Sequence, residues 1–223
     1  MAKTHGTDEY LEAIYILQTE GETVLSSKLA DYLGVARPTI TQTVQRLTTQ
    51  GLLKASPGKE LALTEEGTRR AELVLRRHRL LERWLTDELG LDWADAHVEA
   101  ARLEHSISPL VEERLAERLG NPLTCPHGNA IPGSGAKQLH GAALDEVETP
   151  AQVTVIRIVE LAEEDLDLLR FLHQAGIVPG AVLTLDETKS PYEAGVRVSV
   201  GGEQYALDEK VAKRVLVSVN QHS

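Results

Sequence analysis

The stretch Ser26–Thr64 reads SSKLADYLGVARPTITQTVQRLTTQGLLKASPGKELALT. It opens with a short helical pattern that has serine at its start and Gly34 at its end. A second helical pattern begins at Arg37, with Pro38 in the first turn, where a helix tolerates proline. Two short apolar runs then flank the turn signal Ser-Pro-Gly-Lys. Helix, turn, helix and hairpin in this order predict a winged helix-turn-helix, which is a DNA-binding arrangement.

Short polar and basic side chains gather in the same stretch, and no Asp or Glu occurs between Arg37 and Lys59. Such side chains contact phosphates and base edges. Gln42 is the best candidate for reading a base, because a side-chain amide can make two hydrogen bonds to adenine. The alternative is a small helical domain with a solvated face. The predicted DNA-contacting residues are Ser26, Lys28, Arg37, Pro38, Thr39, Thr41, Gln42, Thr43, Arg46 and Lys59.

The formal net charge of −11 is unusual for a DNA-binding protein, but the acidic residues are unevenly distributed. Residues 1–64 hold six Lys/Arg against seven Asp/Glu, whereas residues 121–223 hold eight against fourteen. A locally basic surface on an acidic protein can still bind phosphates. Cys125 is the only cysteine, which excludes an internal disulfide and a cysteine-rich zinc site. Because the chain shows neither a signal peptide nor a membrane-span pattern, we expect a cytoplasmic protein without a membrane partner.

Changes in residue pattern, marked by glycine and proline, predict an α+β fold, mainly α, in four segments. The second segment contains long Leu-rich helical patterns, broken at Ser108–Pro109, which favour a dimer interface and therefore a homodimer. The third is rich in glycine and proline, and the fourth alternates apolar and polar residues in short runs. The segments are a winged helix-turn-helix domain (1–64), a helical metal-binding and dimerisation domain (65–120), a linker (121–150) and a small β-barrel (151–223).

Histidines and carboxylates recur at helical spacing, so that several of them share one helix face. They form three sets: Glu9 with Glu12, His78 with Glu82, and His97 with Glu104 and His105. One such pair is typical of an ordinary surface interaction, but several sets on three helices predict a metal site. Oxygen and imidazole donors without thiolate favour Mn(II), with Fe(II) as the alternative.

The chain resembles, over essentially its whole length, the family of the diphtheria toxin repressor and the manganese transport regulator. The resemblance is carried by Glu9–Tyr15, Arg37–Val44, Arg77–Glu82, His97–His105 and the linker motif Pro126–Pro132. It implies a repressor whose last domain is a FeoA-like small barrel. It also implies binding to double-stranded operator DNA at metal-transport genes, with Mn(II), or alternatively Fe(II), as co-repressor.

The resemblance further implies two metal sites. His78, Glu82 and His97 match one site, and the family's C-terminal domain can add a ligand to it. Asp165 is the preferred residue for that role and Glu164 is the second choice.

Glu9, Glu104 and His105 match the other site, and Glu12 matches a ligand of the manganese-selective branch. Four residues after His97 the family has a Cys or a bridging Glu, where this chain has Ala101. The site is therefore one ligand short, and water, Asp8 or a main-chain carbonyl are the candidates to complete it.

Cys125 and His127 are interpreted as structural, because a Cys-x-His pair needs two further ligands to hold zinc. Two other functions stay open. A carboxylate-histidine metalloenzyme would need paired Glu-x-x-His motifs, which this sequence lacks. A winged-helix regulator with a non-metal effector would bind DNA regardless of a chelator.

Overall fold

The computed structural model describes residues 6–54, 60–186 and 195–219. The chain separates into two compact units, residues 1–77 and residues 78–223, and each is described by itself. Lys59 and the predicted turn 56–58 lie outside the described residues.

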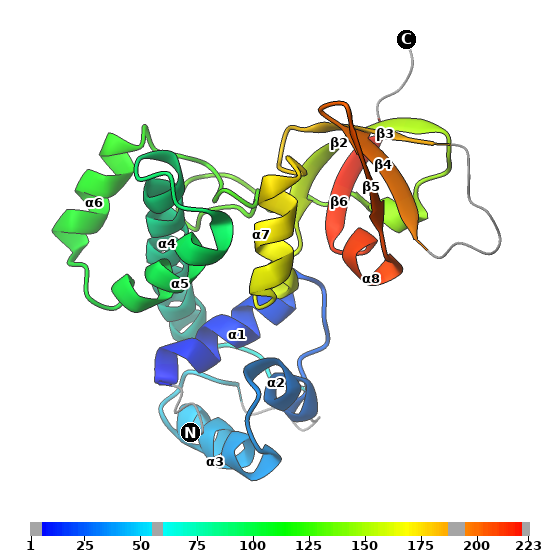
Figure 1. The fold of residues 1–223 in the computed structure, drawn as a ribbon. Helices are drawn as coiled ribbons and strands as arrows, with labels where there is room; N and C mark the ends of the chain where they lie inside the picture. The colour runs from blue at the N-terminus through cyan, green and yellow to red at the C-terminus, as the bar shows by residue number, and fades with distance from the viewer. Residues whose placement is uncertain (1–5, 55–59, 187–194, 220–223) are drawn as a thin grey trace. The chain divides into compact units, whose positions relative to one another are not determined.

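The first unit is helical and includes the predicted helix-turn-helix (Figure 1). Gly34 ends the second helix with a φ of 64°, a left-handed conformation that glycine adopts without a steric penalty. Across the hairpin Leu53 pairs with Leu63, and the Lys54 amide donates to the Ala62 carbonyl at 2.8 Å. The elements are α1 (Thr7–Thr19), α2 (Ser26–Leu33), α3 (Arg37–Thr49) and the beginning of α4 (Glu65–Asp87).

The second unit takes the rest of α4 and adds α5 (Trp93–Leu103) and α6 (Pro109–Arg118). Asp92 caps α5 by accepting a hydrogen bond from the Asp95 amide at 3.0 Å. Ser108 caps α6 in the same way, with Pro109 as its first residue, so the predicted break at Ser108–Pro109 is confirmed. No helix among the described residues is both long enough and apolar enough to cross a membrane.

The C-terminal part of this unit is one antiparallel sheet in the order β1-β6-β2-β3-β4-β5. Because β1 and β5 are its two edges, the sheet is a half-barrel rather than a closed one. The strands are β1 (Ala142–Ala143), β2 (Ala151–Ile158), β3 (Val182–Leu185), β4 (Val196–Val200), β5 (Glu203–Leu207) and β6 (Val215–Val219). Between the strands lie two short 3-10 helices, η1 (Leu144–Glu146) and η2 (Glu160–Ala162), and two α-helices, α7 (Leu166–Gln174) and α8 (Glu209–Ala212).

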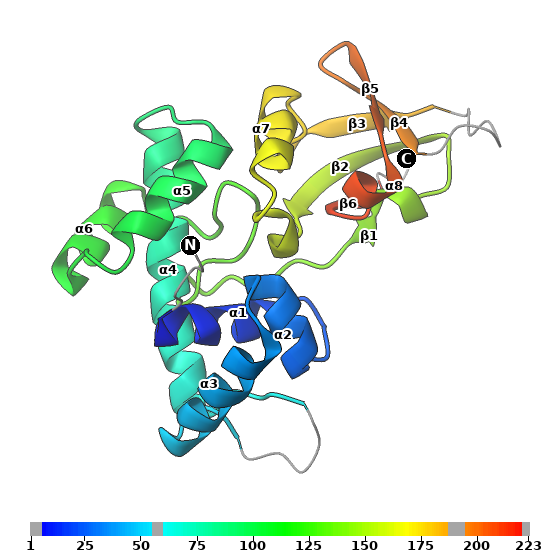
Figure 2. The ribbon, with the colours of Figure 1, turned by 60° about the horizontal axis from the view of Figure 1, so that its bottom comes forward.

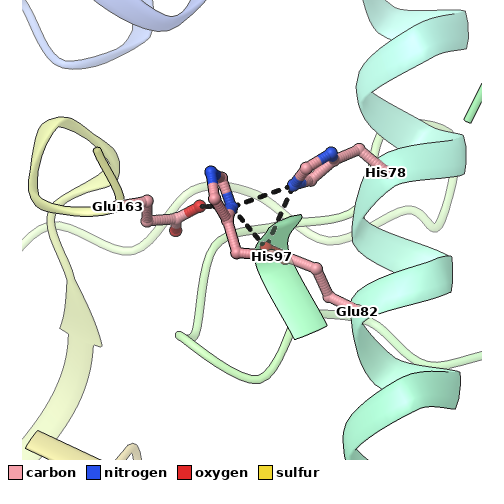
Figure 3. Close-up of side chains that lie close together, drawn as sticks. All are labelled: His78, Glu82, His97 and Glu163. Atoms are coloured by element: carbon pink, nitrogen blue, oxygen red, sulfur yellow. Dashed lines mark hydrogen bonds and ion pairs between the residues drawn. The ribbon is translucent and has the colours of Figure 1, made fainter. Parts of the chain in front are cut away.

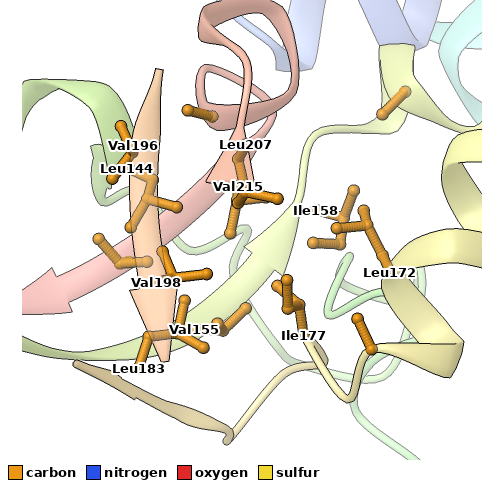
Figure 4. Close-up of a cluster of buried hydrophobic side chains, with 14 of the residues drawn as sticks. Leu144, Val155, Ile158, Leu172, Ile177, Leu183, Val196, Val198, Leu207 and Val215 are labelled. Carbon is orange, nitrogen blue, oxygen red and sulfur yellow. The ribbon is translucent and has the colours of Figure 1, made fainter. Parts of the chain in front are cut away.

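The concave side of the sheet and α7 enclose an aliphatic core, with inward residues at every second strand position (Figure 4). Trp93 and Ala94, at the start of α5, belong to the same buried cluster. Arg170 on α7 adds ion pairs to Asp92 at 3.4 Å and Asp95 at 3.2 Å. In both views α7 lies between α5 and the sheet (Figures 1 and 2). Packing therefore places α5 beside the chain that enters α7.

Part of the predicted linker is buried and ordered by hydrogen bonds. Cys125, His127 and Asn129 are each 1% exposed or less. The Cys125 amide donates to the Asn129 carbonyl at 2.8 Å, and the Ile158 amide at the end of β2 donates to the His127 carbonyl at 2.8 Å. Glycine is required at 128, where φ is +90° and a Cβ atom would lie 2.4 Å from the Ile156 carbonyl oxygen. This segment packs as part of the second unit.

Candidate metal centre and DNA-binding surface

Four side chains of the second unit converge on one point (Figure 3). Glu82 Oε1 lies 3.0 Å from His78 Nε2 and 3.0 Å from His97 Nδ1. The two ring nitrogens are 3.2 Å apart, and Glu163 Oε2 lies 3.7 Å from His97 Nδ1. Two imidazole and two carboxylate donors thus face one another in a buried place.

Each side chain is positioned by a local feature of the sequence. His78 and Glu82 are one turn apart on α4, so they share a face. His97 follows the capped start of α5. Glu163 comes directly after η2, where its amide donates to the Glu160 carbonyl at 2.9 Å, and Asn129 Nδ2 holds its Oε1 at 2.9 Å.

The structure does not bring Asp165 or Glu164 to this group, although the family resemblance implied one of them as the added ligand. Asp165 is the N-cap of α7: it accepts a hydrogen bond from the Leu168 amide at 3.2 Å and pairs with Arg214 at 3.4 Å. Glu164 is exposed. The turn of η2 directs Glu163 inward instead, two residues before the cap.

The buried charges of the site shift the pKa values of His78 and Glu82 in opposite directions. Burial disfavours the charged imidazole of His78, but the carboxylates of Glu82 and Glu104 outweigh it and hold the His78 pKa well above its usual value. Burial also disfavours the Glu82 carboxylate, yet His127, His78 and His97 together hold the Glu82 pKa well below its usual value. The two carboxylates therefore favour the protonated form of the His78 imidazole, and a cation bound at His78 Nε2 would compete with that proton.

The second predicted ligand set is only partly assembled within the second unit. Glu104 is buried and its Oε2 lies 2.6 Å from His78 Nδ1, while His105 Nε2 is 3.3 Å from Glu104 Oε1. Ala101 is exposed.

Glu9, Glu12 and Asp8 belong to the first unit. Glu9 accepts a hydrogen bond from the Gly6 amide at 2.6 Å, at the start of α1. Asp8, one candidate for completing the site, pairs with Arg70. The metal roles of this set stay predictions.

His127 and Cys125, which sequence reasoning treated as structural, lie directly beside the four converging side chains. His127 Nδ1 is 3.0 Å from Glu163 Oε1 and 3.7 Å from Glu82 Oε2. One donor atom each from Cys125, His127 and Glu82 lie within 4.8 Å of one another. The Cys-x-His spacing was a visible signal, but the partners that the pair needs come from residues far away in the sequence.

The exposed side of α3 carries most of the predicted DNA-contacting residues: Arg37, Pro38, Thr39, Thr41, Gln42 and Arg46. Thr43 is an exception that corrects the sequence prediction. It is 7% exposed, because residues 40, 43 and 47 form the face of α3 that is buried in the first unit. Ser26 and Lys28 on α2 are half-buried, and Lys28 pairs with Glu22.

Three family models match consecutive parts of the chain. The N-terminal DNA binding domain of iron dependent repressors matches residues 4–61, and their metal binding and dimerisation domain matches residues 64–133. The FeoA domain matches residues 143–219.

Relatives and solved structures agree with these matches. The iron-dependent repressor IdeR of Mycobacterium tuberculosis (strain ATCC 25618 / H37Rv) is 39% identical over 223 residues, which cover 95% of this chain and 96% of the relative. The diphtheria toxin repressor of Corynebacterium diphtheriae is 32% identical over 220 residues, with 95% and 96% covered. A manganese-dependent transcriptional repressor in complex with manganese has a TM-score of 0.83 at 29% identity, covering 96% of this chain and 100% of its own. The fold class is thereby confirmed, and the relatives and the solved structure named here are repressors rather than enzymes.

Proposed function

Because the chain belongs to the diphtheria toxin repressor family of metal-dependent transcriptional repressors, we propose that it is a homodimeric repressor of metal-transport genes with Mn(II) as its co-repressor. Fe(II) is the second candidate, because relatives named iron-dependent repressors share 39% of the sequence. A winged-helix regulator with a non-metal effector is the alternative function, and the experiment below distinguishes the two.

The observation that carries this proposal is the convergence of His78, Glu82, His97 and Glu163. Metal–ligand bonds of about 2.0 to 2.2 Å place neighbouring donor atoms on one ion roughly 3 to 3.5 Å apart. The separations of 3.0, 3.0 and 3.2 Å among His78, Glu82 and His97 match that spacing, and Glu163 lies slightly farther out, at 3.7 Å from His97. Nitrogen and oxygen donors suit Mn(II) and Fe(II), which supply the positive charge that would hold these groups together.

Exposed side chains support the DNA and dimer parts of the proposal. Gln42 and Arg46 lie on the exposed face of α3, in the place where a recognition helix presents its base-reading and phosphate-binding residues. On α6, Leu110 is 62% and Val111 49% exposed, which is a surface that a second copy would cover.

We infer that metal acts by restricting the dimer. In our hypothesis the metal-free dimer samples many spacings between its two recognition helices, and metal selects the spacing that fits successive major grooves, about 34 Å apart. A coupling of about 1 to 3 kcal/mol between metal and DNA is typical of allosteric proteins. Because such coupling is reciprocal, operator DNA would also tighten metal binding.

Fluorescence anisotropy with DNA from upstream of a metal-transporter gene tests this function, with Mn(II) and Fe(II) titrated separately. Salt is held constant, because phosphate contacts dominate affinity, and excess chelator provides the metal-free reference. We expect metal to tighten binding at least about tenfold, or about 1.4 kcal/mol.

His97→Ala removes one donor of the site, and the exposed His140 offers the matched control His140→Ala. We expect the metal response to be lost in the first variant and kept in the second. Equal affinity with metal and with chelator would contradict the metal switch and would favour a non-metal effector.

A further inference from the structure

Of the four converging side chains, Glu163 is the one that comes from the C-terminal part of the chain. His78 and Glu82 lie on α4 and His97 lies on α5, whereas Glu163 follows η2 and precedes α7. Its separation from His97 Nδ1, 3.7 Å, therefore depends on how the half-barrel packs against α5. The contact between α5 and α7 is a place in the second unit where this separation can be controlled.

One face of α7 carries two side chains that contact the first turn of α5. Arg170 and His173 are three residues apart on α7, so they share a face. Arg170 Nε donates to Asp92 Oδ2 at 3.4 Å, and its Nη2 donates to Asp95 Oδ1 at 3.2 Å. One planar guanidinium therefore joins α7 to two carboxylates at the start of α5.

A stacked pair of rings lies beside these hydrogen bonds. Trp93, the first residue of α5, is 3% exposed, and its ring stacks on the His173 imidazole with 5.2 Å between the centroids and 5° between the planes. The same indole packs edge-on against His127, with 4.6 Å between the centroids. Such ring pairs stabilise a contact beyond the apolar area that they bury. The start of α5 is thus in contact with both α7 and the segment that follows α6.

The other face of α7 belongs to the half-barrel. Three of its leucines are buried in the aliphatic core: Leu168, Leu169 and Leu172. Because these leucines fix α7 to the sheet, docking α7 on α5 also positions the chain that leads from η2 into α7, which includes Glu163. On α5, His97 follows Asp92 by five residues, or about 7.5 Å along the helix, so the docking contact lies close to the metal centre.

We propose that Arg170 and His173 are positioning residues of the metal centre, which dock α7 on the first turn of α5 and thereby hold Glu163 beside His97. Neither residue belongs to the four converging side chains. The docking contacts join protein groups only, so they need no metal ion. A metal ion then meets donors that are already held together, which reduces the cost of ordering them on binding. The proposal rests on the proposed function, because it takes Glu163 and His97 as donors to the co-repressor metal.

The sign of one substitution separates positioning from direct electrostatics. Arg170→Glu replaces a positive charge near the site with a negative one, which by Coulomb's law alone would tighten the binding of a cation. Positioning predicts the opposite, because the new carboxylate would repel Asp92 and Asp95 and move α7, with Glu163, away from His97. An exposed ion pair changes an equilibrium constant by roughly fivefold at most. Because two pairs are lost and repulsion is added, we expect Arg170→Glu to weaken Mn(II) binding at least about tenfold.

Mn(II) added to chelator-treated full-length protein is the probe, and the free ion is counted by electron paramagnetic resonance. The charge swap Arg170→Glu/Asp95→Arg should recover most of the affinity that Arg170→Glu loses. His173→Ala, which removes the stacked ring, should weaken Mn(II) binding about two- to tenfold. Lys210→Glu, at an exposed position of α8, makes the same change of net charge as Arg170→Glu and should bind Mn(II) as the parent does. In a His97→Ala background Arg170→Glu should have no further effect, which assigns the loss to this metal position.

Tryptophan emission reports the docking in the metal-free protein. The chain has two tryptophans, so Trp84→Phe leaves Trp93 as the only one. In that background Arg170→Glu should shift the emission to longer wavelength, because the buried Trp93 ring gains contact with water. The charge swap should reverse this shift. Saturating Mn(II) should also move the emission back towards that of the parent, because the coupling between docking and metal binding is reciprocal.

Three results would overturn the proposal. The first is tighter or unchanged Mn(II) binding in Arg170→Glu. The second is weaker binding with unchanged Trp93 emission, since the charge would then act without moving α7. The third is a loss of affinity that the charge swap does not recover, since the substitution would then have damaged the fold rather than the contact with α5.

The positioning role and the proposed function fail separately. Mn(II) binding that depends on Arg170, in a protein whose DNA binding ignores metal, would contradict the metal switch alone. Metal-dependent DNA binding with a Mn(II) affinity that Arg170→Glu leaves unchanged would contradict the positioning role alone.

Discussion

Asn129 makes four hydrogen bonds that tie the predicted linker to Glu163 and the end of β2, and replacing it with leucine tests that role. Its Nδ2 donates to Glu163 Oε1 at 2.9 Å and to the Ile158 carbonyl at 3.1 Å. Its Oδ1 accepts from Gln138 Nε2 at 2.8 Å and from Arg157 Nη1 at 3.0 Å. The side chain is fully buried, so water cannot take over these four bonds.

The loss of stability expected for Asn129→Leu follows from the four hydrogen-bond partners of Asn129. A hydrogen bond to a neutral group contributes about 0.5 to 1.5 kcal/mol and one to a charged group about 1.5 to 3 kcal/mol. Asn129 makes two bonds to neutral groups and two to charged groups. The expected loss in the free energy of unfolding is therefore at least about 4 kcal/mol. For a unit of this size such a loss lowers Tm by roughly 8 to 16 °C.

Urea unfolding of the metal-free protein, followed by tryptophan fluorescence, measures the change. Both tryptophans, Trp84 and Trp93, lie in the second unit, so the signal reports on the part of the chain that contains Asn129. Gln152→Leu, an amide-to-leucine change at an exposed position of β2, is the control and should stay within about 0.5 kcal/mol of the parent. A loss below about 1 kcal/mol for Asn129→Leu would refute the four-bond argument.

Two further results are expected. Gly128→Ala should destabilise the second unit by about 3 kcal/mol or more. The new Cβ would lie 2.4 Å from the Ile156 carbonyl oxygen, and alanine would also have to adopt a φ of +90°. Gly135→Ala, at a φ of +85° with open space around it, should lose only about 1 to 2 kcal/mol in the same unfolding assay, and equal losses would argue against the close packing on β2. In the metal-free protein the raised pKa of His78 stabilises the fold fully below the unfolded pKa, and this stability should be lost as pH rises through the folded pKa. The depressed pKa of Glu82 acts in the opposite sense, since its contribution is lost as pH falls through the folded pKa, so a free energy of unfolding that keeps rising into the alkaline range would contradict the assignment.

Local signals in the sequence were sufficient for the helical part of the fold. Gly34 and Pro38 mark the turn between α2 and α3, and Ser108 with Pro109 marks the start of α6. The spacing of His78 and Glu82 places them on one face of α4, because helical periodicity relates residues four apart whatever surrounds them. Strand alternation was equally visible in β2, β3, β4 and β6, although the sheet proved to be an open half-barrel.

Tertiary packing decided which residues converge at the candidate metal site. The choice of Glu163 over Asp165 depends on η2, which turns the chain so that one carboxylate faces His97 while the other caps α7. Thr43 is buried because α3 uses that face for the core of its own unit. Cys125 and His127 lie beside Glu82 and Glu163 because β2 binds their backbone across 31 residues, through the bond from Ile158 to His127. Spacing along the chain determines what shares a helix face, whereas contacts between distant segments depend on how the whole unit packs, and no local pattern contains that information.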